Sequence, residues 1–152
     1  MKEFKKILFP VDFSEVSSKI VPYVITMANK LDAEVHLAFV VRKLENYRSI
    51  FVSPMSVENF ENEIVLGAET KMEEFVQGFF KSILKPKTKI LIGDIAEEII
   101  MYIKDEGIDL VIIGTHGRKG MDRIILGSIA DRVIKSAPVP VLSVNPYQVT
   151  VF

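Results

Sequence analysis

Residues 108–130 read IDLVIIGTHGRKGMDRIILGSIA, in which a short apolar run leads into a glycine-rich loop and then into a helical pattern. The apolar run, Leu110–Ile113, has no polar residue between its hydrophobic ones. Such a run is typical of a strand that is buried on both faces, as in a parallel sheet covered by helices. The stretch therefore predicts the strand, loop and helix of an α/β protein.

The rest of the chain repeats this alternation of strand and helix patterns. Strands are predicted at Ile7–Asp12, Val35–Val41, Lys89–Ile92, Leu110–Gly114 and Val139–Val144. Helices are predicted at Ser14–Lys30, Val57–Leu84 and Asp94–Asp105, and from Ser128 to the residue before Pro138. Alternation of this kind implies an open, twisted parallel sheet of five strands with right-handed crossovers and helices on both faces. We expect a single α/β domain over residues 1–152.

Polar residues stand where three of these helices are expected to begin. Ser14 is a candidate cap for the first helix, and Asp94 opens the third through a capping box. Ser128 opens the last helix in the same way. Pro22 lies inside the first helix and predicts a kink or a late start there. The long second helix carries an apolar stripe that is expected to face the core, made of Phe60, Ile64, Ala68, Met72, Phe75 and Phe79.

The composition limits the classes of protein to which the chain can belong. Nineteen Lys or Arg and twenty Asp or Glu give a formal charge of −1, which gives no reason to expect nucleic acid or a membrane as a partner. The absence of cysteine excludes disulfides, thiolate metal sites and a cysteine nucleophile. The mean hydropathy of +0.28 argues against disorder. No apolar run approaches the ~20 residues of a membrane span, so we expect a soluble, cytoplasmic protein.

Glycines recur along the loop after the predicted fourth strand, at Gly114, Gly117, Gly120 and Gly127, with Ser128 following the last. Glycine lets the backbone approach a ligand closely, so the N–H groups of such a loop can point at phosphate oxygens. The start of the following helix adds unpaired N–H groups and the positive end of a dipole. The loop matches neither the Walker A nor the dinucleotide-binding pattern. Spacing alone leaves a simple turn as the alternative.

The spacing of these glycines resembles the G-2x-G-9x-G-[ST] signature of ATP-binding universal stress proteins. Gly114, Gly117, Gly127 and Ser128 fit the signature without insertion or deletion. The opening KKILFPVDFSE, the approach GIDLVIIGTHG and the closing PVPVLSV are also similar to that family. The similarity spans nearly the whole chain and is weakest at Arg42–Ser56.

The resemblance implies the Rossmann-like fold of the adenine nucleotide alpha hydrolases, with sheet order 3-2-1-4-5. This order makes strands one and four neighbours, and their carboxyl ends form the switch point where open α/β sheets bind ligands. Asp12 is expected to accept hydrogen bonds from the nucleoside or to lie near a metal ion. The residues that match the family's nucleotide-binding positions are Pro10, Val11, Asp12, Val40, Ile113, Gly114, Gly117, Arg118, Gly127, Ser128 and Ile129.

The function that the resemblance implies is that of an ATP-binding stress-response or regulatory module, with Mg²⁺ or Mn²⁺ accompanying the nucleotide. A slow ATPase, an AMP-binding protein and a nucleotide-free dimeric interaction protein are the alternatives. His116 is a weak candidate for a catalytic base, and the other interpretation is a loop residue whose backbone matters more than its ring. The apolar edge strand Val139–Val144 is expected to pair with its copy in a homodimer, as is common in the family.

Overall fold

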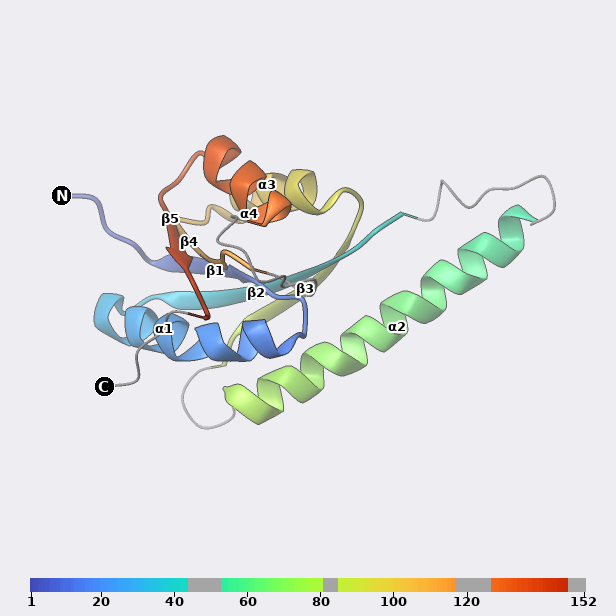
Figure 1. The fold of residues 1–152 in the computed structure, drawn as a ribbon, viewed down its shortest axis with the longest axis horizontal. Helices are drawn as coiled ribbons and strands as arrows, with labels where there is room; N and C mark the ends of the chain where they lie inside the picture. Colours follow the sequence, from blue (N-terminus) through green and yellow to red (C-terminus); the bar gives the residue numbers. More distant parts are fainter. Residues whose placement is uncertain (44–52, 81–84, 117–126, 148–152) are drawn as a thin grey trace.

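The computed structural model describes residues 1–43, 53–80, 85–116 and 127–147 (Figure 1). Strands and helices alternate along these residues as the sequence predicts. Most predicted boundaries lie within two residues of the observed ones, and the second helix differs more. The elements are β1 (Lys6–Pro10), α1 (Glu15–Leu31), β2 (Glu34–Val41), α2 (Pro54–Phe79), β3 (Lys87–Ile92), α3 (Ile95–Glu106), β4 (Leu110–Gly114), α4 (Ser128–Ser136) and β5 (Val141–Val144).

The five strands form one sheet in the order β3-β2-β1-β4-β5, with every neighbouring pair parallel. This order confirms the predicted fold class. Strand β1 therefore lies between β2 and β4, with Ile7 opposite both Val35 and Leu110. Because the chain leaves β1 toward β2 and returns to β4 on the other side, the switch point falls at the carboxyl ends of β1 and β4.

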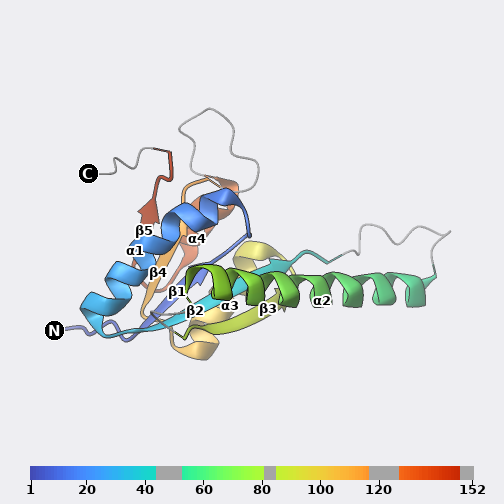
Figure 2. The ribbon, with the colours of Figure 1, turned by 90° about the horizontal axis from the view of Figure 1, so that it is seen from below.

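Helices cover both faces of the sheet, as predicted (Figure 2). On one face, α1 and α2 pack on strand residues such as Ile7, Phe9 and Ile112. On the other face, α3 and α4 pack on the residues that alternate with them, such as Leu8 and Val111. Both sets of side chains are almost fully buried, since successive residues of a strand point to opposite faces.

Helix α2 is longer than the sheet beside it and reaches beyond the strands in both views (Figures 1 and 2). It begins three residues earlier than predicted because Ser53 caps it, accepting a 3.2 Å hydrogen bond from the amide of Ser56. Pro54 follows at the first helical position, where a missing N–H costs nothing. The predicted core stripe is only half right, since Met72 and Phe75 are buried whereas Phe60 and Phe79 are 53% and 42% exposed.

Two of the three predicted side-chain caps are wrong. Ser14 does precede α1, but its side chain makes no capping hydrogen bond. Gly127 rather than Ser128 is the cap of α4, and it has no side chain to offer. Asp94 does cap α3, accepting a 3.1 Å bond from the amide of Glu97. Pro22 lies within α1, which begins at Glu15, so the predicted late start is also wrong.

No helix among the described residues is both long enough and apolar enough to cross a lipid bilayer.

Candidate functional site

Strands β1 and β4 are paired only at their amino-terminal halves. The register joins Ile7 to Leu110 and Leu8 to Val111. Farther along, β1 remains attached to β2, because Pro10 lies opposite Ala38 and the amide of Val11 donates to the Ala38 carbonyl at 2.9 Å. The two neighbouring strands therefore separate toward their carboxyl ends, which creates the opening that a switch point requires.

The turn after β1 holds the carboxylate of Asp12 in a fixed orientation. Its Oδ1 atom accepts hydrogen bonds from the amide of Ser14 at 2.9 Å and from the Ser17 hydroxyl at 2.8 Å. The Ser14 hydroxyl donates to the same oxygen, which is why it does not cap the helix. The amide of Asp12 in turn donates to the Ser17 oxygen at 3.1 Å. The start of α1 thus places an oriented negative charge at the end of β1.

Phe13 gives this turn its shape through a left-handed backbone, with φ of +59°. A bulky residue seldom adopts this conformation, which costs about 1–2 kcal/mol. The ring stacks on Phe39 of β2 with centroids 4.6 Å apart and meets the edge of Phe75 of α2 at 6.1 Å. These contacts hold Phe13 in place between Asp12, which carries the carboxylate, and Ser14, which immediately precedes α1.

On the other side of the opening, Gly114 ends β4 directly beneath α1. A β-carbon at this position would collide with Cδ1 of Ile20 and would lie 3.6 Å from Cγ1 of Val16. Its glycine is therefore explained by the close approach of the helix, independently of any ligand. The amide of Thr115, the next residue, donates to the carbonyl of Val144 at 2.9 Å, which extends the pairing with β5.

The start of α4 returns to this point. The amide of Gly127 donates to the Thr115 carbonyl at 2.6 Å, and a β-carbon on Gly127 would lie only 3.2 Å from that same oxygen. The first hydrogen bond inside the helix runs from the amide of Asp131 to the Gly127 carbonyl at 2.9 Å. The amides of Ser128 and Ile129 precede that bond and belong to the unpaired first turn, which carries the positive end of the dipole.

The remaining predicted residues fall into two groups. Val11, Val40 and Ile113 are buried at 6%, 7% and 6% exposure, with Val11 on the α1 side of the sheet and the other two on the α3 and α4 side. Gly117 and Arg118 lie outside the described residues. The described part of the prediction, which is Pro10, Val11, Asp12, Val40, Ile113, Gly114, Gly127, Ser128 and Ile129, lies at the carboxyl ends of β1, β2 and β4 and at the start of α4.

His116 is held by its neighbours. Its Nδ1 atom lies 2.9 Å from the hydroxyl oxygen of Thr115, and its ring meets the ring of Tyr147 edge to face at 5.0 Å. The ammonium of Lys19, from α1, lies 5.3 Å from the centre of the Tyr147 ring. These contacts tie the segment after β5 to the start of the glycine-rich loop, a connection that the sequence did not indicate.

The ion pair between Asp94 and Arg132 is also absent from the sequence prediction. The guanidinium donates to both carboxylate oxygens, at 3.1 and 2.8 Å, and joins the first turn of α3 to α4. Hydrogen bonds from Arg132 and from the Glu97 amide lower the pKa of Asp94 below its ordinary value of 3.8. This link is a second attachment of α4, in addition to the bond between Gly127 and Thr115. Within the described ranges, no three His, Asp or Glu side chains are grouped so as to hold a metal ion.

A sequence profile of the Universal stress protein family matches residues 3–145. The chain belongs to the universal stress protein family. Universal stress protein MJ0577 of Methanocaldococcus jannaschii is 36% identical over 154 aligned residues, which cover 93% of this chain and 95% of that protein. Universal stress protein MJ0531 of the same organism is also 36% identical, over 93% of this chain and 82% of its own length.

Solved structures agree with this assignment. The structure of MJ0577 superposes on this universal stress protein with a TM-score of 0.82 at 32% identity, covering 95% of this chain and 97% of the other. UspA from Lactobacillus plantarum gives 0.78 at 23% identity, with 95% and 100% covered, and shares the fold. Two more distant members, each 15% identical, were solved in complex with nucleotides. One is an Archaeoglobus fulgidus protein with dAMP (TM-score 0.64, 93% and 98% covered) and the other a protein with cAMP (0.60, 95% and 99%).

Proposed function

We propose that this protein binds an adenine nucleotide, ATP by the pattern of its glycines, between the carboxyl ends of β1 and β4, and that it acts as a nucleotide-dependent regulatory module. The observation that carries the proposal is the meeting of two elements at one opening of the sheet. They are the oriented carboxylate of Asp12 and the start of α4, which is held against Thr115.

Each element suits one end of a nucleotide. A carboxylate accepts hydrogen bonds from ribose hydroxyls, and Asp12 has the orientation for this role fixed by Ser14 and Ser17. Unpaired amides at the start of a helix suit phosphate, because they donate hydrogen bonds and add the positive end of the dipole. We assign the nucleoside to the side of Pro10, Val11, Asp12 and Val40, and the phosphates to Gly114, Gly117, Arg118, Gly127, Ser128 and Ile129. Ile113 then lies beneath the phosphate side.

The dAMP and cAMP complexes of two distant members support an adenine nucleotide as the class of ligand. Both nucleotides are monophosphates, so AMP stands as the alternative to ATP. Binding of ATP and binding of AMP differ in how much the residues on the phosphate side contribute to the affinity. If the start of α4 and the glycine loop contact a β- or γ-phosphate, ATP binds more tightly than AMP.

A divalent cation, Mg²⁺ or Mn²⁺, would enter with the phosphates of the nucleotide and neutralise part of their charge. The Oδ1 atom of Asp12 already accepts hydrogen bonds from Ser14 and Ser17. A metal contact through that oxygen would compete with these donors, so we assign Asp12 primarily to the nucleoside.

We further propose that the protein forms a homodimer through the edge strand β5. The predicted segment Val139–Val144 is shorter in the structure, where β5 covers Val141–Val144 and Pro140 contributes only its carbonyl, to the amide of Val111 at 3.0 Å. Leu142 and Ser143 are exposed, and the strand has no charged side chain. An edge strand without charges is suited to pairing with another chain.

Calorimetric titration of the full chain with ATP and with AMP, each with and without Mg²⁺, tests the proposed ligand. We expect Asp12→Asn to weaken both nucleotides about tenfold, the factor that corresponds to one lost hydrogen bond to a charged group. Asp32→Asn is the matched control, since Asp32 is an exposed carboxylate at the far end of α1. Equal affinities for ATP and AMP would overturn the assignment of ATP, and the absence of binding to either would overturn the site.

A further inference from the structure

Strand β3 has one edge that no described strand covers. It is the outer strand of the sheet, next to β2 alone. The amide of Gly93 donates to the Val41 carbonyl of β2 at 2.9 Å, and successive residues of a strand point their N–H groups alternately to its two sides. Counting back from Gly93 in steps of two, the amides of Leu91 and Lys89 point toward β2, so the amides of the alternate residues Ile90 and Thr88 point away from it. These outward groups are the kind to which a further strand can pair.

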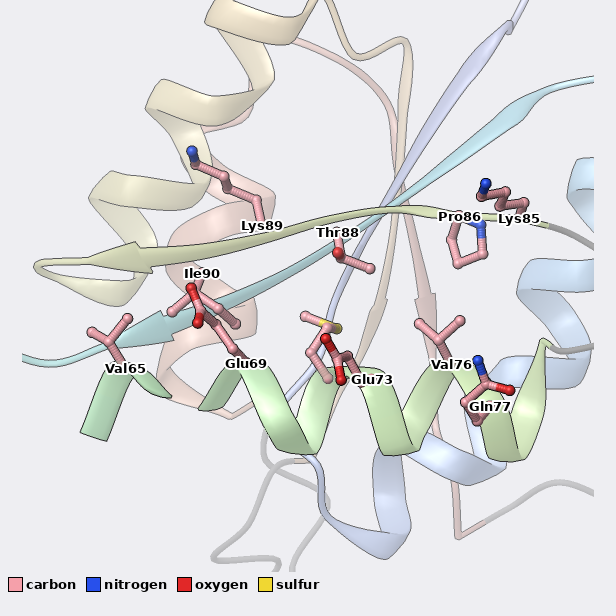
Figure 3. Close-up of a pocket in the computed structure, with 11 residues that line it drawn as sticks. Val65, Glu69, Glu73, Val76, Gln77, Lys85, Pro86, Thr88, Lys89 and Ile90 are labelled. Atoms are coloured by element: carbon pink, nitrogen blue, oxygen red, sulfur yellow. The ribbon is translucent and has the colours of Figure 1, made fainter. Parts of the chain in front are cut away.

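A groove runs between this strand and the helix that covers it. It has a volume of about 710 Å³ and separates α2 from β3 (Figure 3). Its apolar lining includes Met72 and Val76 of α2 and Ile90 of β3, all packed on the adjoining core. Figure 3 shows Thr88 and Ile90 on the side of β3 that faces α2, and Lys89 on the opposite side. An added strand would therefore point every second side chain into the groove.

The two sides of β3 present charges of opposite sign. Glu69 and Glu73 line the groove from α2 and are exposed, and Lys85 lines it at one end. Lys89 also belongs to the lining, but its side chain points away from α2 (Figure 3), and Lys87 lies on that same side of the strand. Lys87 is paired with Glu34 at 3.1 Å. Across the described parts of the chain, Glu69, Glu73 and Lys89 have no ion-pair partner within 4.0 Å. Strand β3 separates these two sets of charges. A strand bound at its edge could therefore face the glutamates with one set of side chains and the lysines with the other.

We propose that the free edge of β3 receives an extended segment of another protein as an additional strand, with apolar side chains directed into the groove and acidic side chains directed to the side of Lys87 and Lys89. Acidic side chains directed into the groove would instead be repelled by Glu69 and Glu73, which disfavours the opposite orientation of the segment. A shift of the segment by one residue exchanges its two faces, so these rows of charge select the register as well as the partner.

The lysines also argue against a second copy of this chain as the occupant. Pairing β3 with its own copy would set Lys87 and Lys89 beside the same residues of the other subunit. Like charges directly across neighbouring strands are destabilising. Lysine on an edge strand is a recognised protection against such self-pairing. The uncharged β5 has no such protection, so the two edges of the sheet differ in the partner they favour.

The test is the binding of two labelled heptapeptides of equal composition to the full chain, measured by fluorescence anisotropy. One peptide alternates valine and glutamate, and the other groups the same residues in blocks. We expect the alternating peptide to bind at least about tenfold more tightly, and its affinity to fall as salt is added. Lys89→Glu should weaken it about tenfold, whereas Lys104→Glu, an equal change of charge on an exposed site of α3, should leave it unchanged.

A second variant tests pairing through the backbone. Thr88→Pro removes an outward N–H without removing a bond to β2, so it should abolish binding of the alternating peptide while the thermal unfolding transition is retained. Equal binding of the two peptides, or full binding by Thr88→Pro, would overturn the proposal. So would loss of a dimer on Thr88→Pro in sedimentation velocity, because the edge of β3 would then receive a second copy of this chain.

Discussion

The backbone N–H of Gly127 donates a 2.6 Å hydrogen bond to the carbonyl oxygen of Thr115. The bond joins the start of α4 to the end of β4 across residues 116–126. Because Gly127 immediately precedes the unpaired first turn of α4, this bond determines where the helix presents its amides relative to the opening between β1 and β4. The last motif glycine thus has a structural partner within the chain in addition to its proposed ligand.

A side chain at position 127 should disturb this arrangement. A β-carbon there would lie 3.2 Å from the Thr115 oxygen, which is closer than ordinary contact. We expect Gly127→Ala to displace the start of α4 and to weaken ATP about tenfold in calorimetric titration, with little change for adenosine. Gly107→Ala is the control, because its added carbon meets nothing, although its φ of +64° is strained. It should lower stability by about 1 kcal/mol and leave ATP affinity unchanged.

Substitution of Gly114, at the other end of the loop, should lower the stability of the fold and not only the binding of ATP. The added carbon of Gly114→Ala would collide with Cδ1 of Ile20, which is 2% exposed and has little room to move. We expect a loss of about 1–3 kcal/mol in the free energy of unfolding, measured in urea. Ile20→Val removes the colliding atom. The double variant should therefore be more stable than the sum of the two single losses predicts.

These two glycines illustrate what the sequence could and could not predict. The alternation of patterns predicted a parallel sheet with helices on both faces. The spacing of the glycines, through the resemblance to the universal stress proteins, led to the strand order and to the proposed site. The contact between Gly114 and Ile20 was not predictable, because it joins residues that are distant in sequence and depends on how closely α1 packs on β4. For the same reason the exposure of Phe60 was missed, since helical periodicity does not reveal that α2 is longer than the sheet.

The ion pair between Asp94 and Arg132 should contribute a small, pH-dependent part of the stability. Its effect on the Asp94 pKa is downward, so the contribution is fully present above 3.8 and is lost as the pH falls through the lowered value. Arg132→Gln should lower the urea midpoint at pH 7, and the difference from the parent should vanish in strong acid. Lys135→Gln is the control, because its partner Asp131 is in the same helix. A difference that persists in acid would assign the loss to packing of Arg132.

Tyr102 should cause a loss of stability at alkaline pH. Its hydroxyl lies 2.9 Å from Nδ1 of the fully buried His36, and burial raises the pKa of Tyr102 from 10.0 to about 12. The unfolded chain therefore releases this proton first, and stability falls between pH 10 and 12 by up to about 1.4 kcal/mol per pH unit. Tyr102→Phe should remove this part of the slope in urea unfolding series. Tyr147→Phe, at an exposed tyrosine, should retain it.

The left-handed backbone of Phe13 leads to an inverted order of stability for two small substitutions. Both Phe13→Ala and Phe13→Gly remove the ring that stacks on Phe39 and meets Phe75, so each loses the same packing. At φ of +59° alanine keeps the steric conflict of its β-carbon, whereas glycine has none. We therefore expect the glycine variant to be more stable than the alanine variant by about 1 kcal/mol in urea unfolding. At Thr26, on the exposed side of α1, the same pair of substitutions should show the usual order, with alanine about 1 kcal/mol more stable than glycine. An alanine variant as stable as the glycine variant at position 13 would mean that the turn relaxes once the ring is gone, and that the stacking on Phe39 is what imposes its conformation.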